Sequence, residues 1–461
     1  MIQKLHAVII YLIIILSVSF IFAGNLVAQY AVSTLAGTST QGNPFAGPNG
    51  ICITPDGTSL YLADYTAQRI KKINIGTGAV SNYAGNGTAG YLDGSLLTAK
   101  FNYPSGIKIS SDGLFLYVCD NNNCLIRKID VAAGTVSTVA GVYNAFSFAD
   151  NANGLLAMFN QPTDLTIAPG DSVLYVSDTE NHIIRKINLL TTAVTTIAGT
   201  PVSYGSTDGI GAAAKFHNPK GICISGNGVR LYIADAGNNK IRKIELANLM
   251  VSTVAGNGIA SYIDNTNGLT ASFNIPQGLC ALSNDSLLYI DDTFNNRIRQ
   301  INLTTTEVST LAGTVSTPNS HFVDNGNGLL AKFYHPVNSI LSKNSDKLYI
   351  SDQENYRVRI MNTDVVVTSV NENISDNIFS IYPNPVRDYL TIQLKTIPND
   401  SYSYSIVDAR GRPIIAETKI SATIADETVN INVKNVSDGI YFLQLMLAQK
   451  FYSMKIIKMD D

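Results

Sequence analysis

Short runs in which apolar and polar residues alternate fill most of the chain, and turn residues such as Asp-Gly and Asn-Asn separate them. A period of two predicts β-strands, and the runs lack the 3.6-residue period of an amphipathic helix. Residues 101–141 show the unit clearly, with the four runs GIKIS, LFLYVCD, LIRKIDV and TVSTVAG. We therefore expect an all-β fold built from units of four strands.

The four-strand unit recurs six times along the chain. Each copy has a proline at the start of its first strand and an aspartate at the end of its second, and successive aspartates are 56 to 60 residues apart. A fixed period with four strands per repeat predicts a six-bladed β-propeller. The prolines are Pro48, Pro104, Pro162, Pro219, Pro276 and Pro336, and the aspartates are Asp64, Asp120, Asp178, Asp235, Asp292 and Asp352.

The sixth copy lacks a fourth strand after its third, RVRIMN. A matching segment, YAVSTLAG, stands at residues 30–37, before the first copy. We expect this N-terminal strand to be the outermost strand of the last blade, because such pairing closes the ring and removes exposed sheet edges.

The two ends of the chain differ from the repeats. Residues 1–28 read as a signal peptide, with Lys4 before a long apolar stretch and a small-residue cleavage site after Ala28; an uncleaved signal anchor is the alternative. Residues 29–363 form the predicted propeller and 364–378 a polar linker. Residues 379–461 alternate apolar residues with turn signals, which predicts a small antiparallel β-sandwich. No segment after the signal peptide is long and apolar enough to span a bilayer.

The string AGNGTAGYLDGSLLTAKFNYPSGIKISSDGLFLYVCDNNNCLIRKID resembles an NHL repeat of the long form found in exported bacterial proteins. The resemblance covers roughly residues 30–363. It implies the propeller but not one activity, because NHL-like propellers include protein binders, RNA binders and a few lyases or lactonases. The first repeat departs from the others, with Ala67 in place of Asn, Lys71 in place of Arg, and a shortened connection before it.

The C-terminal block resembles the type A sorting domain of proteins exported by the type IX secretion system. YPNP at 382–385, DARGR at 408–412 and DGIYFLQL at 438–445 carry the resemblance. It implies a Bacteroidetes-type source, the type IX machinery as a partner, and a secreted or cell-surface protein. The motif residues are Tyr382, Pro383, Asn384, Pro385, Gly411 and Gly439.

The strand-end aspartates allow two interpretations. A ring of carboxylates could bind calcium or take part in catalysis. Each aspartate also stands seven residues before a basic residue, so an ion pair would satisfy both groups without a ligand, and we favour this structural role. The arginines are Arg127, Arg185, Arg242, Arg299 and Arg359, with Lys71 in the first copy.

A second set of aspartates stands in the connections between repeats, as Asp93, Asp150, Asp208, Asp264 and Asp324. Asp-Gly and Asp-Asn order loops, whereas a calcium site needs several oxygen ligands at one point. The histidines His182, His217, His321 and His335 show no zinc-type spacing. We expect no cofactor, with calcium or zinc as the alternative.

Strand alternation places the turns after each second strand and the long connections on one face of the propeller. Aromatic residues in those connections would stack on a glycan or peptide, or pack under their own loops. We predict a non-catalytic, monomeric scaffold binding a protein, peptide or glycan; a metal-dependent lyase or lactonase and a structural adhesin module are the alternatives. A net charge of −3 argues against nucleic acid. The candidate ligand residues are Tyr91, Phe146, Phe148, Tyr204, Tyr262 and Phe322.

Five cysteines leave at least one unpaired in an exported protein. Cys52, Cys223 and Cys280 share one repeat position and are expected to be apolar fillers of an inner strand. Cys119 and Cys124 flank a turn, where a local bridge is the alternative to two free thiols.

Overall fold

The computed structural model describes residues 30–38, 43–314, 322–363, 379–394, 402–408, 413–420, 428–447 and 450–459. The chain divides into two compact units, one spanning Tyr30–Asp364 and the other containing Val365–Asp461. The predicted signal peptide and linker, His321, and Gly411 of the sorting motif lie outside the described residues. No helix among the described residues is long and apolar enough to cross a membrane.

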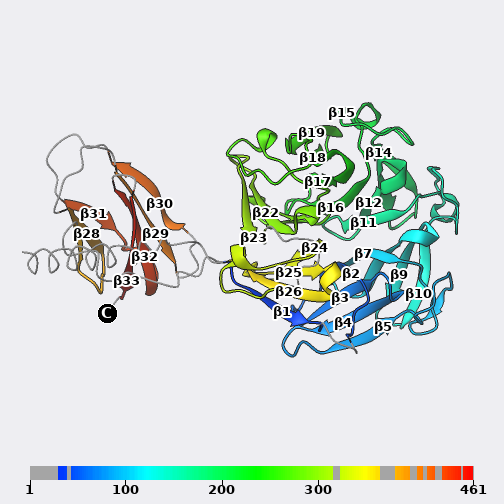
Figure 1. Ribbon diagram of the computed structural model, residues 1–461, viewed down its shortest axis with the longest axis horizontal. Coiled ribbons are helices and arrows are strands. Elements are labelled where there is room, and N and C mark those ends of the chain that lie inside the picture. The colour runs from blue at the N-terminus through cyan, green and yellow to red at the C-terminus, as the bar shows by residue number, and fades with distance from the viewer. Residues whose placement is uncertain are drawn as a thin grey trace, which may run out of the picture. The chain divides into compact units, whose positions relative to one another are not determined.

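Six antiparallel sheets form the first unit, and each contains four main strands (Figure 1). Blade 1 contains β2 (Pro48–Ile53), β3 (Ser59–Asp64), β4 (Arg69–Asn74) and β5 (Val80–Ala84). Blade 2 contains β7 (Pro104–Ile109), β8 (Phe115–Asp120), β9 (Leu125–Asp130) and β10 (Thr135–Ala140). Blade 3 contains β11 (Pro162–Ile167), β12 (Val173–Asp178), β13 (Ile183–Asn188) and β14 (Val194–Ala198).

The other three sheets repeat this order. Blade 4 contains β16 (Pro219–Ile224), β17 (Arg230–Asp235), β18 (Lys240–Glu245) and β19 (Met250–Ala255). Blade 5 contains β20 (Leu279–Ala281), β21 (Leu287–Asp292), β22 (Arg297–Asn302) and β23 (Val308–Ala312). Blade 6 contains β24 (Pro336–Leu341), β25 (Lys347–Asp352), β26 (Arg357–Asn362) and β1 (Val32–Ala36).

The first strands of the blades contact one another in the cyclic order β2, β7, β11, β16, β20, β24 and back to β2, so they surround the axis of a ring. The N-terminal strand β1 pairs antiparallel with β26, with Val32 opposite Met361. The predicted all-β propeller fold and its closure by the N-terminal strand are therefore confirmed.

Apolar side chains fill the space between adjacent blades. The second strand of blade 1, SLYLAD, is buried at every residue because a neighbouring blade covers each of its faces. Tyr61 and Ala63 of blade 1, for example, share a core with Leu116 and Val118 of blade 2. Burial of such side chains supplies the main driving force for packing the blades. Cys52, Cys223 and Cys280 lie in three of these inter-blade cores, as expected.

Cys119 and Cys124 are both buried and free, so the local bridge considered from the sequence is not formed. Their positions on either side of the short 3₁₀ turn η1 (Asn121–Asn123) place them in the blade core instead. Corresponding turns follow the second strands of the next four blades: η3 (Thr179–Asn181), η5 (Ala236–Asn238), η7 (Thr293–Asn295) and η9 (Gln353–Asn355).

The long connections cover the outer edges of blades 2–6. The short strand β6 (Gly94–Ser95) pairs with β10, and β15 (Gly209–Ile210) pairs with β19. In blades 3, 5 and 6, single bridges join Asn151 to Val194, Asn265 to Val308 and Asn325 to Val32. The connections also form η2 (Gly154–Leu156), η4 (Gly211–Ala213), η6 (Gly268–Thr270) and η8 (Gly328–Leu330).

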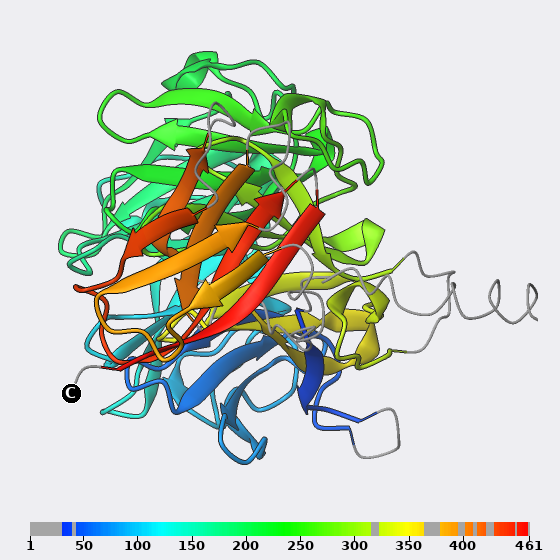
Figure 2. The ribbon, with the colours of Figure 1, turned by 90° about the vertical axis from the view of Figure 1, so that its left-hand side faces the viewer.

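The second unit contains two sheets, with strand orders β27-β28-β31 and β30-β29-β32-β33. Leu390 and Ile431 of one sheet share a core with Ile406 and Leu443 of the other, which is the predicted sandwich (Figure 2, orange to red). Asn384 of the YPNP motif donates to the carbonyl of Lys455 and accepts from the N–H of Ile457. The strands are β27 (Phe379–Tyr382), β28 (Tyr389–Leu394), β29 (Tyr402–Asp408), β30 (Pro413–Ile420), β31 (Thr428–Asn432), β32 (Gly439–Leu447) and β33 (Lys450–Lys458).

Candidate ligand-binding face

The strand-end aspartates of blades 2–6 form the expected ion pairs. In blade 3, Arg185 Nη1 lies 2.8 Å from Asp178 Oδ2, and both side chains have no exposed surface. Asp178 also accepts from the N–H of Asn160 and from the side-chain amide of Asn181. The same pairs occur, at 2.6 to 2.8 Å, as Asp120–Arg127, Asp235–Arg242, Asp292–Arg299 and Asp352–Arg359. The inner ring of carboxylates is thus engaged within each blade, where it joins the second and third strands to the preceding connection.

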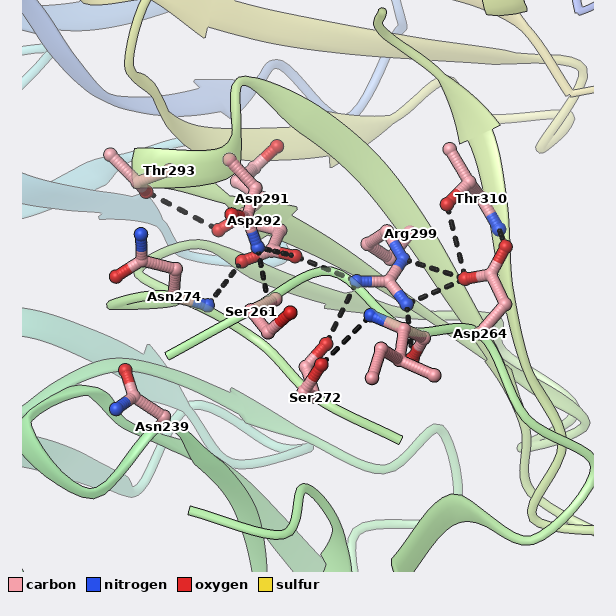
Figure 3. A network of polar contacts seen from close by, with 12 residues as sticks. Asn239, Ser261, Asp264, Ser272, Asn274, Asp291, Asp292, Thr293, Arg299 and Thr310 are labelled. Atoms are coloured by element: carbon pink, nitrogen blue, oxygen red, sulfur yellow. Dashed lines mark hydrogen bonds and ion pairs between the residues drawn. The ribbon is translucent and has the colours of Figure 1, made fainter. Parts of the chain in front are cut away.

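The loop aspartates bind the other side of the same arginines. Asp264 Oδ1 lies 2.5 Å from Arg299 Nη2 and 3.1 Å from the Thr310 hydroxyl, which ties the connection to blade 5 (Figure 3). Equivalent pairs join Asp93 to Arg127, Asp150 to Arg185, Asp208 to Arg242, and Asp324 to Arg359. We refer to each arginine with its two aspartates as a clamp. Among the described residues, no group of three His, Cys, Asp or Glu side chains could hold a metal ion.

Four of the six candidate ligand aromatics pack on arginines. The rings stand two residues before the loop aspartates, and each lies over a guanidinium as a cation–π contact. Tyr91 lies 5.1 Å from Arg127, Phe148 5.4 Å from Arg185, Tyr262 4.2 Å from Arg297, and Phe322 3.4 Å from Arg357. These contacts give each ring a partner within the protein, while Tyr91, Phe148 and Tyr262 remain 36% to 48% exposed.

Tyr204 and Phe146 differ from the other four rings. Both stand four residues before the loop aspartate rather than two. Tyr204 is 65% exposed, and its ring stacks on His217 at 4.7 Å instead of on an arginine. Blade 4 has Ser206 where the other connections place their aromatic ring. Tyr204 is therefore available for a ligand.

Aromatic rings also gather where the first strands begin, at alternate junctions between blades. Tyr65 lies 4.6 Å from Tyr103 at the junction of blades 1 and 2. Between blades 5 and 6, His335 lies 4.6 Å from Phe294 and 4.8 Å from Tyr334. Between blades 3 and 4, His182, Tyr204 and His217 lie within 5.8 Å of one another. The first strands surround the axis of the ring, and these three groups lie where those strands begin. We therefore call them the mouth clusters.

The backbone before the first strand is strained at five blade junctions, three of which carry a mouth cluster. The residue before the blade proline has a left-handed φ at Tyr103, Gln161, Asn218, Ile275 and His335, between 47° and 54°. Side chains of the preceding blade hold four of these residues by accepting their N–H groups, for example Gln68 for Tyr103 and Asn296 for His335. Strained backbone of this kind concentrates at functional sites, where the surrounding fold must stabilise it.

Local features build the cluster between blades 3 and 4. His182 ends η3 in a left-handed conformation, and its Nδ1 accepts the N–H of Asn218 at 3.2 Å. The side chain of Asn218 donates to Glu180 Oε1 at 2.7 Å. Gly237 makes room for His217, since a Cβ at this glycine would lie 2.6 Å from the imidazole Cγ.

Burial and neighbouring charges shift the titration of this cluster. Burial lowers the pKa of His182, His217 lowers it further, and Glu180 opposes the change. Burial also lowers the pKa of Lys220, which follows the proline of blade 4, and the carboxylate of Glu180 again opposes it. The cluster thus combines His182, whose burial favours the neutral imidazole, with a lysine that loses part of its hydration.

The interior of the ring is closely packed beneath the mouth. Glycines two residues after the proline in four blades let the first strands approach; a Cβ at Gly221 would lie 1.8 Å from the carbonyl oxygen of Gln277. Asp164 and Asn338 occupy the same position in blades 3 and 6, and their side chains lie 3.4 Å apart. The carboxylate of Asp164 accepts the N–H groups of Leu165 and Ile222.

Two family models match parts of the chain. Residues 380–459 match the secretion system C-terminal sorting domain, and residues 101–129 match the NHL repeat. The chain thus carries an NHL repeat and a sorting domain that indicates export through the type IX secretion system to the cell surface or the extracellular space.

Curated relatives match about half of the chain. The chain is 32% identical over 233 residues to SUPPRESSOR OF QUENCHING 1 of Arabidopsis thaliana, covering 47% of this chain and 22% of that protein. It is 27% identical over 352 residues to the human NHL repeat-containing protein 2, covering 58% and 48%. The chain therefore spans about half or less of the length of these relatives.

Solved structures share the fold at low identity. A Bacteroides thetaiotaomicron protein described as an auxiliary nutrient binding protein matches with a TM-score of 0.55 and 16% identity, over 72% of this chain and 76% of that one. A second match has the same TM-score and identity and is a Bacteroides thetaiotaomicron protein of unknown function. At this identity the likeness shows the fold alone.

Proposed function

We propose that this NHL-repeat protein, which carries a secretion system C-terminal sorting domain, is an exported binding protein whose long-loop face holds a glycan or a peptide. The three mouth clusters carry the proposal. They gather aromatic rings at alternate blade junctions, and these rings contact one another instead of a clamp arginine. Aromatic rings bind sugars and peptides by stacking. The sorting domain supplies the route to the cell exterior.

The proposal separates scaffold residues from ligand residues. The clamps explain both aspartate rings without a ligand, and cation–π contacts with clamp arginines or with Arg297 and Arg357 engage four of the loop aromatics. Tyr103, Tyr204 and Phe294, one from each mouth cluster, have no such role in a clamp. A protein of similar fold is described as nutrient binding. The proposal rests instead on the aromatic residues of the loop face of this chain.

Glycan and peptide arrays test the proposal with the purified protein. We expect a ligand whose signal falls in the variants Tyr103→Ala, Tyr204→Ala and Phe294→Ala. The control is Leu190→Ala, since Leu190 is 91% exposed in the turn between the third and fourth strands, on the opposite face. Loss of signal in the control, or an unchanged signal in all three variants, would contradict a loop-face site.

Elemental analysis separates binding from the alternative function. A metal bound in stoichiometric amount would favour the lyase or lactonase, and a protein without array ligands would favour the structural adhesin module. Neither alternative depends on the mouth clusters, so the variants separate binding from both alternatives, and the metal content separates the two alternatives from each other.

Export is tested in the host cell. We propose that residues 1–28 are removed as a signal peptide and that residues from 379 onward serve only as an address. Deleting residues 379–461 should leave a folded propeller in the periplasm, because few contacts cross such a boundary. Mature protein at the surface should lack those residues. Normal surface delivery of the truncated chain would defeat the proposal.

A further inference from the structure

The outer edges of five blades show which kind of segment such an edge binds. In blade 5 the N–H of Val308 donates to the carbonyl of Asn265 at 2.9 Å, and the N–H of Thr310 donates to Asp264 Oδ2 at 3.0 Å (Figure 3). Blades 2, 3, 4 and 6 hold their connections at the same positions, and in each the loop aspartate accepts the corresponding threonine N–H at 2.9 to 3.2 Å. The edge therefore suits an extended segment with an aspartate at a fixed place.

Blade 1 has the same edge, but no described segment lies on it. Val80 and Asn82 of β5 occupy the positions of Val308 and Thr310, with the same irregularity in the pairing to the third strand. The preceding connection spans only residues 37–47, compared with 85–103 before blade 2. Among the described residues, the N–H groups of Val80 and Asn82 have no acceptor beyond the edge. Such an edge is a template for a further strand.

The side chains beside this edge are positively charged. Residues 65–92 contain Arg69, Lys71 and Lys72 and no aspartate or glutamate. Lys71 stands where the other blades have the clamp arginine; its ammonium donates to Asn82 Oδ1 at 2.7 Å and lies 3.9 Å from Asp64. Each clamp arginine contacts two carboxylates, whereas Lys71 has one at a longer distance. A carboxylate on an incoming segment would take the place of the loop aspartate that blade 1 lacks.

Arg69 adds a position for an aromatic ring. It corresponds to Arg297 of blade 5 and Arg357 of blade 6, which lie under rings two residues before the loop aspartate, at 4.2 and 3.4 Å. The guanidinium of Arg69 is held by donation to the carbonyl of Asn86 at 2.8 Å, and no aromatic ring among the described residues lies over it. Blade 1 thus has the partners for both side chains of an aromatic–x–Asp segment.

We propose that the outer edge of β5 binds an extended segment of a partner protein with the pattern aromatic–x–Asp, which adds a strand antiparallel to β5. Its aspartate accepts the N–H of Asn82 and contacts Lys71, and its ring lies over Arg69. A second copy of this chain is a poorer occupant, because its described loop aspartates are held in its own blades and its β5 has no carboxylate. Strand addition of this kind is a common mode of peptide recognition, and here it does not depend on the mouth clusters.

Titration of the full chain with the peptide ASYIDNTN, which copies residues 260–267, tests the inference. We expect this peptide to bind, and its Asp264→Asn form to bind about tenfold more weakly. Hydrogen exchange in the complex should slow at the amides of Val80 and Asn82 by about tenfold or more. The amide of Val194 should not change, because the edge of blade 3 is already occupied.

Variants of the protein locate the peptide. Val80→Pro removes an outward N–H and keeps the pairing to β4, and it should lower the affinity by about tenfold or more. Lys71→Met should bring the affinities of the Asp and Asn peptides to within about twofold. Lys72→Met is the matched control, since it removes the same charge from the next residue, whose ammonium lies 5.5 Å from the ring of Tyr61. This control should keep wild-type affinity for both peptides, and thermal melts should show all three variants folded.

Several outcomes would overturn the inference. They are no binding up to about 1 mM peptide, equal affinity for the Asp and Asn peptides, equal losses in Lys71→Met and Lys72→Met, and slowed exchange outside β5 alone. Protection of Val80 that rises with protein concentration without peptide would assign the edge to a second copy and would also overturn it. If Val80→Pro does not fold, Lys71→Met and the exchange data decide. The array ligand and its dependence on Tyr103, Tyr204 and Phe294 are measured separately, so failure at this edge leaves the proposed loop-face function standing.

Discussion

Blade 1 and the other five blades stabilise the same sheet with different residues. In blades 2–6, an arginine on the third strand binds two aspartates, and a connection pairs with the outer strand. In blade 1, Lys71 donates to Asn82 and lies 3.9 Å from Asp64, and the preceding connection is too short to supply a loop aspartate. No described residue pairs with the outer edge of β5.

This difference shows that the clamp and the edge cover form one unit. The inner half of the clamp persists in blade 1, where Asp64 accepts the N–H groups of Ala46 and Gly47. The outer half changes as a set: lysine replaces arginine, Asn82 replaces threonine, and the cover is absent. The loop aspartate binds both the arginine and the threonine. Without the long connection there is no loop aspartate, and both residues lose this partner.

The largest expected effect comes from removing a clamp arginine. Arg185→Met should destabilise the propeller by about 3 to 5 kcal/mol, because Asp178 would remain buried without its cation. Lys71→Met in blade 1 should cost less, about 1 to 2 kcal/mol, because Lys71 lies 3.9 Å from the buried Asp64 and its closer contact is with the neutral side chain of Asn82. Chemical denaturation of both variants measures the contrast. Equal losses would mean that the clamp adds nothing over the blade 1 arrangement.

The two aspartates of one clamp should contribute unequally to the stability of the propeller. Asp178→Ala should cost about 3 kcal/mol, since it leaves a buried guanidinium with unmet hydrogen-bonding capacity. Asp150→Ala should cost about 1 kcal/mol, because its side chain is 40% exposed and water can replace part of the contact. Melting temperatures test this order. An unchanged melting temperature for Asp178→Ala would defeat the structural role of the inner carboxylates.

A third prediction contrasts Asp291 of blade 5 with Ala63, its counterpart in blade 1. Asp291 is fully buried; its carboxylate oxygens have no hydrogen bond of good geometry among the described residues, although the Ser339 hydroxyl favours the ionised form. Burial raises its pKa from 3.8 to about 7. The folded state therefore binds this proton more tightly than the unfolded state, so the contribution of Asp291 to stability is full below about pH 4 and is lost as pH rises from about 4 to 7.

The expected loss between pH 5 and pH 8 is about 2 to 3 kcal/mol from this group. Asp291→Ala, which restores the blade 1 residue, should remove this share of the loss from the pH profile of the free energy of unfolding, while Asp120 and Asp178, whose pKa values burial raises to about 6, keep a smaller slope of the same sign. A variant profile parallel to that of the wild type would show that Asp291 is not the group responsible.

The sequence predicts the scaffold better than the binding face. The repeat period predicts the blades and the closing strand, and the seven-residue spacing predicts the pair of Asp178 and Arg185, since both residues stand on adjacent strands of one hairpin. Sequence spacing does not predict that the loop aspartate Asp150 is a second partner of Arg185. Asp150 lies 35 residues before Arg185, on a connection whose path depends on the outer edge that it covers.

The candidate site illustrates a further limit. The register of the loop aromatics distinguishes Tyr204 from Tyr91 in the sequence, because one stands four and the other two residues before its aspartate. The mouth clusters give no comparable signal. Tyr65 and Tyr103, for example, come from different blades and meet only because the turn after a second strand and the entry to the next first strand share a junction.

The smallest expected effect concerns the uncovered edge of blade 1. The N–H of Val194 donates to the carbonyl of Asn151 at 2.9 Å, and Val308 and Val32 make the same bond in blades 5 and 6. Val80 has the equivalent position in β5 but no such acceptor among the described residues. Its amide should exchange with solvent about tenfold or more faster than that of Val194. The Val194 amide must first break its hydrogen bond to Asn151, whereas the Val80 amide has no such bond to break. Hydrogen exchange followed by NMR measures both amides in one sample. Similar protection of Val80 and Val194 would mean that another segment covers β5, and the contrast between blade 1 and the other blades would then be confined to the clamp.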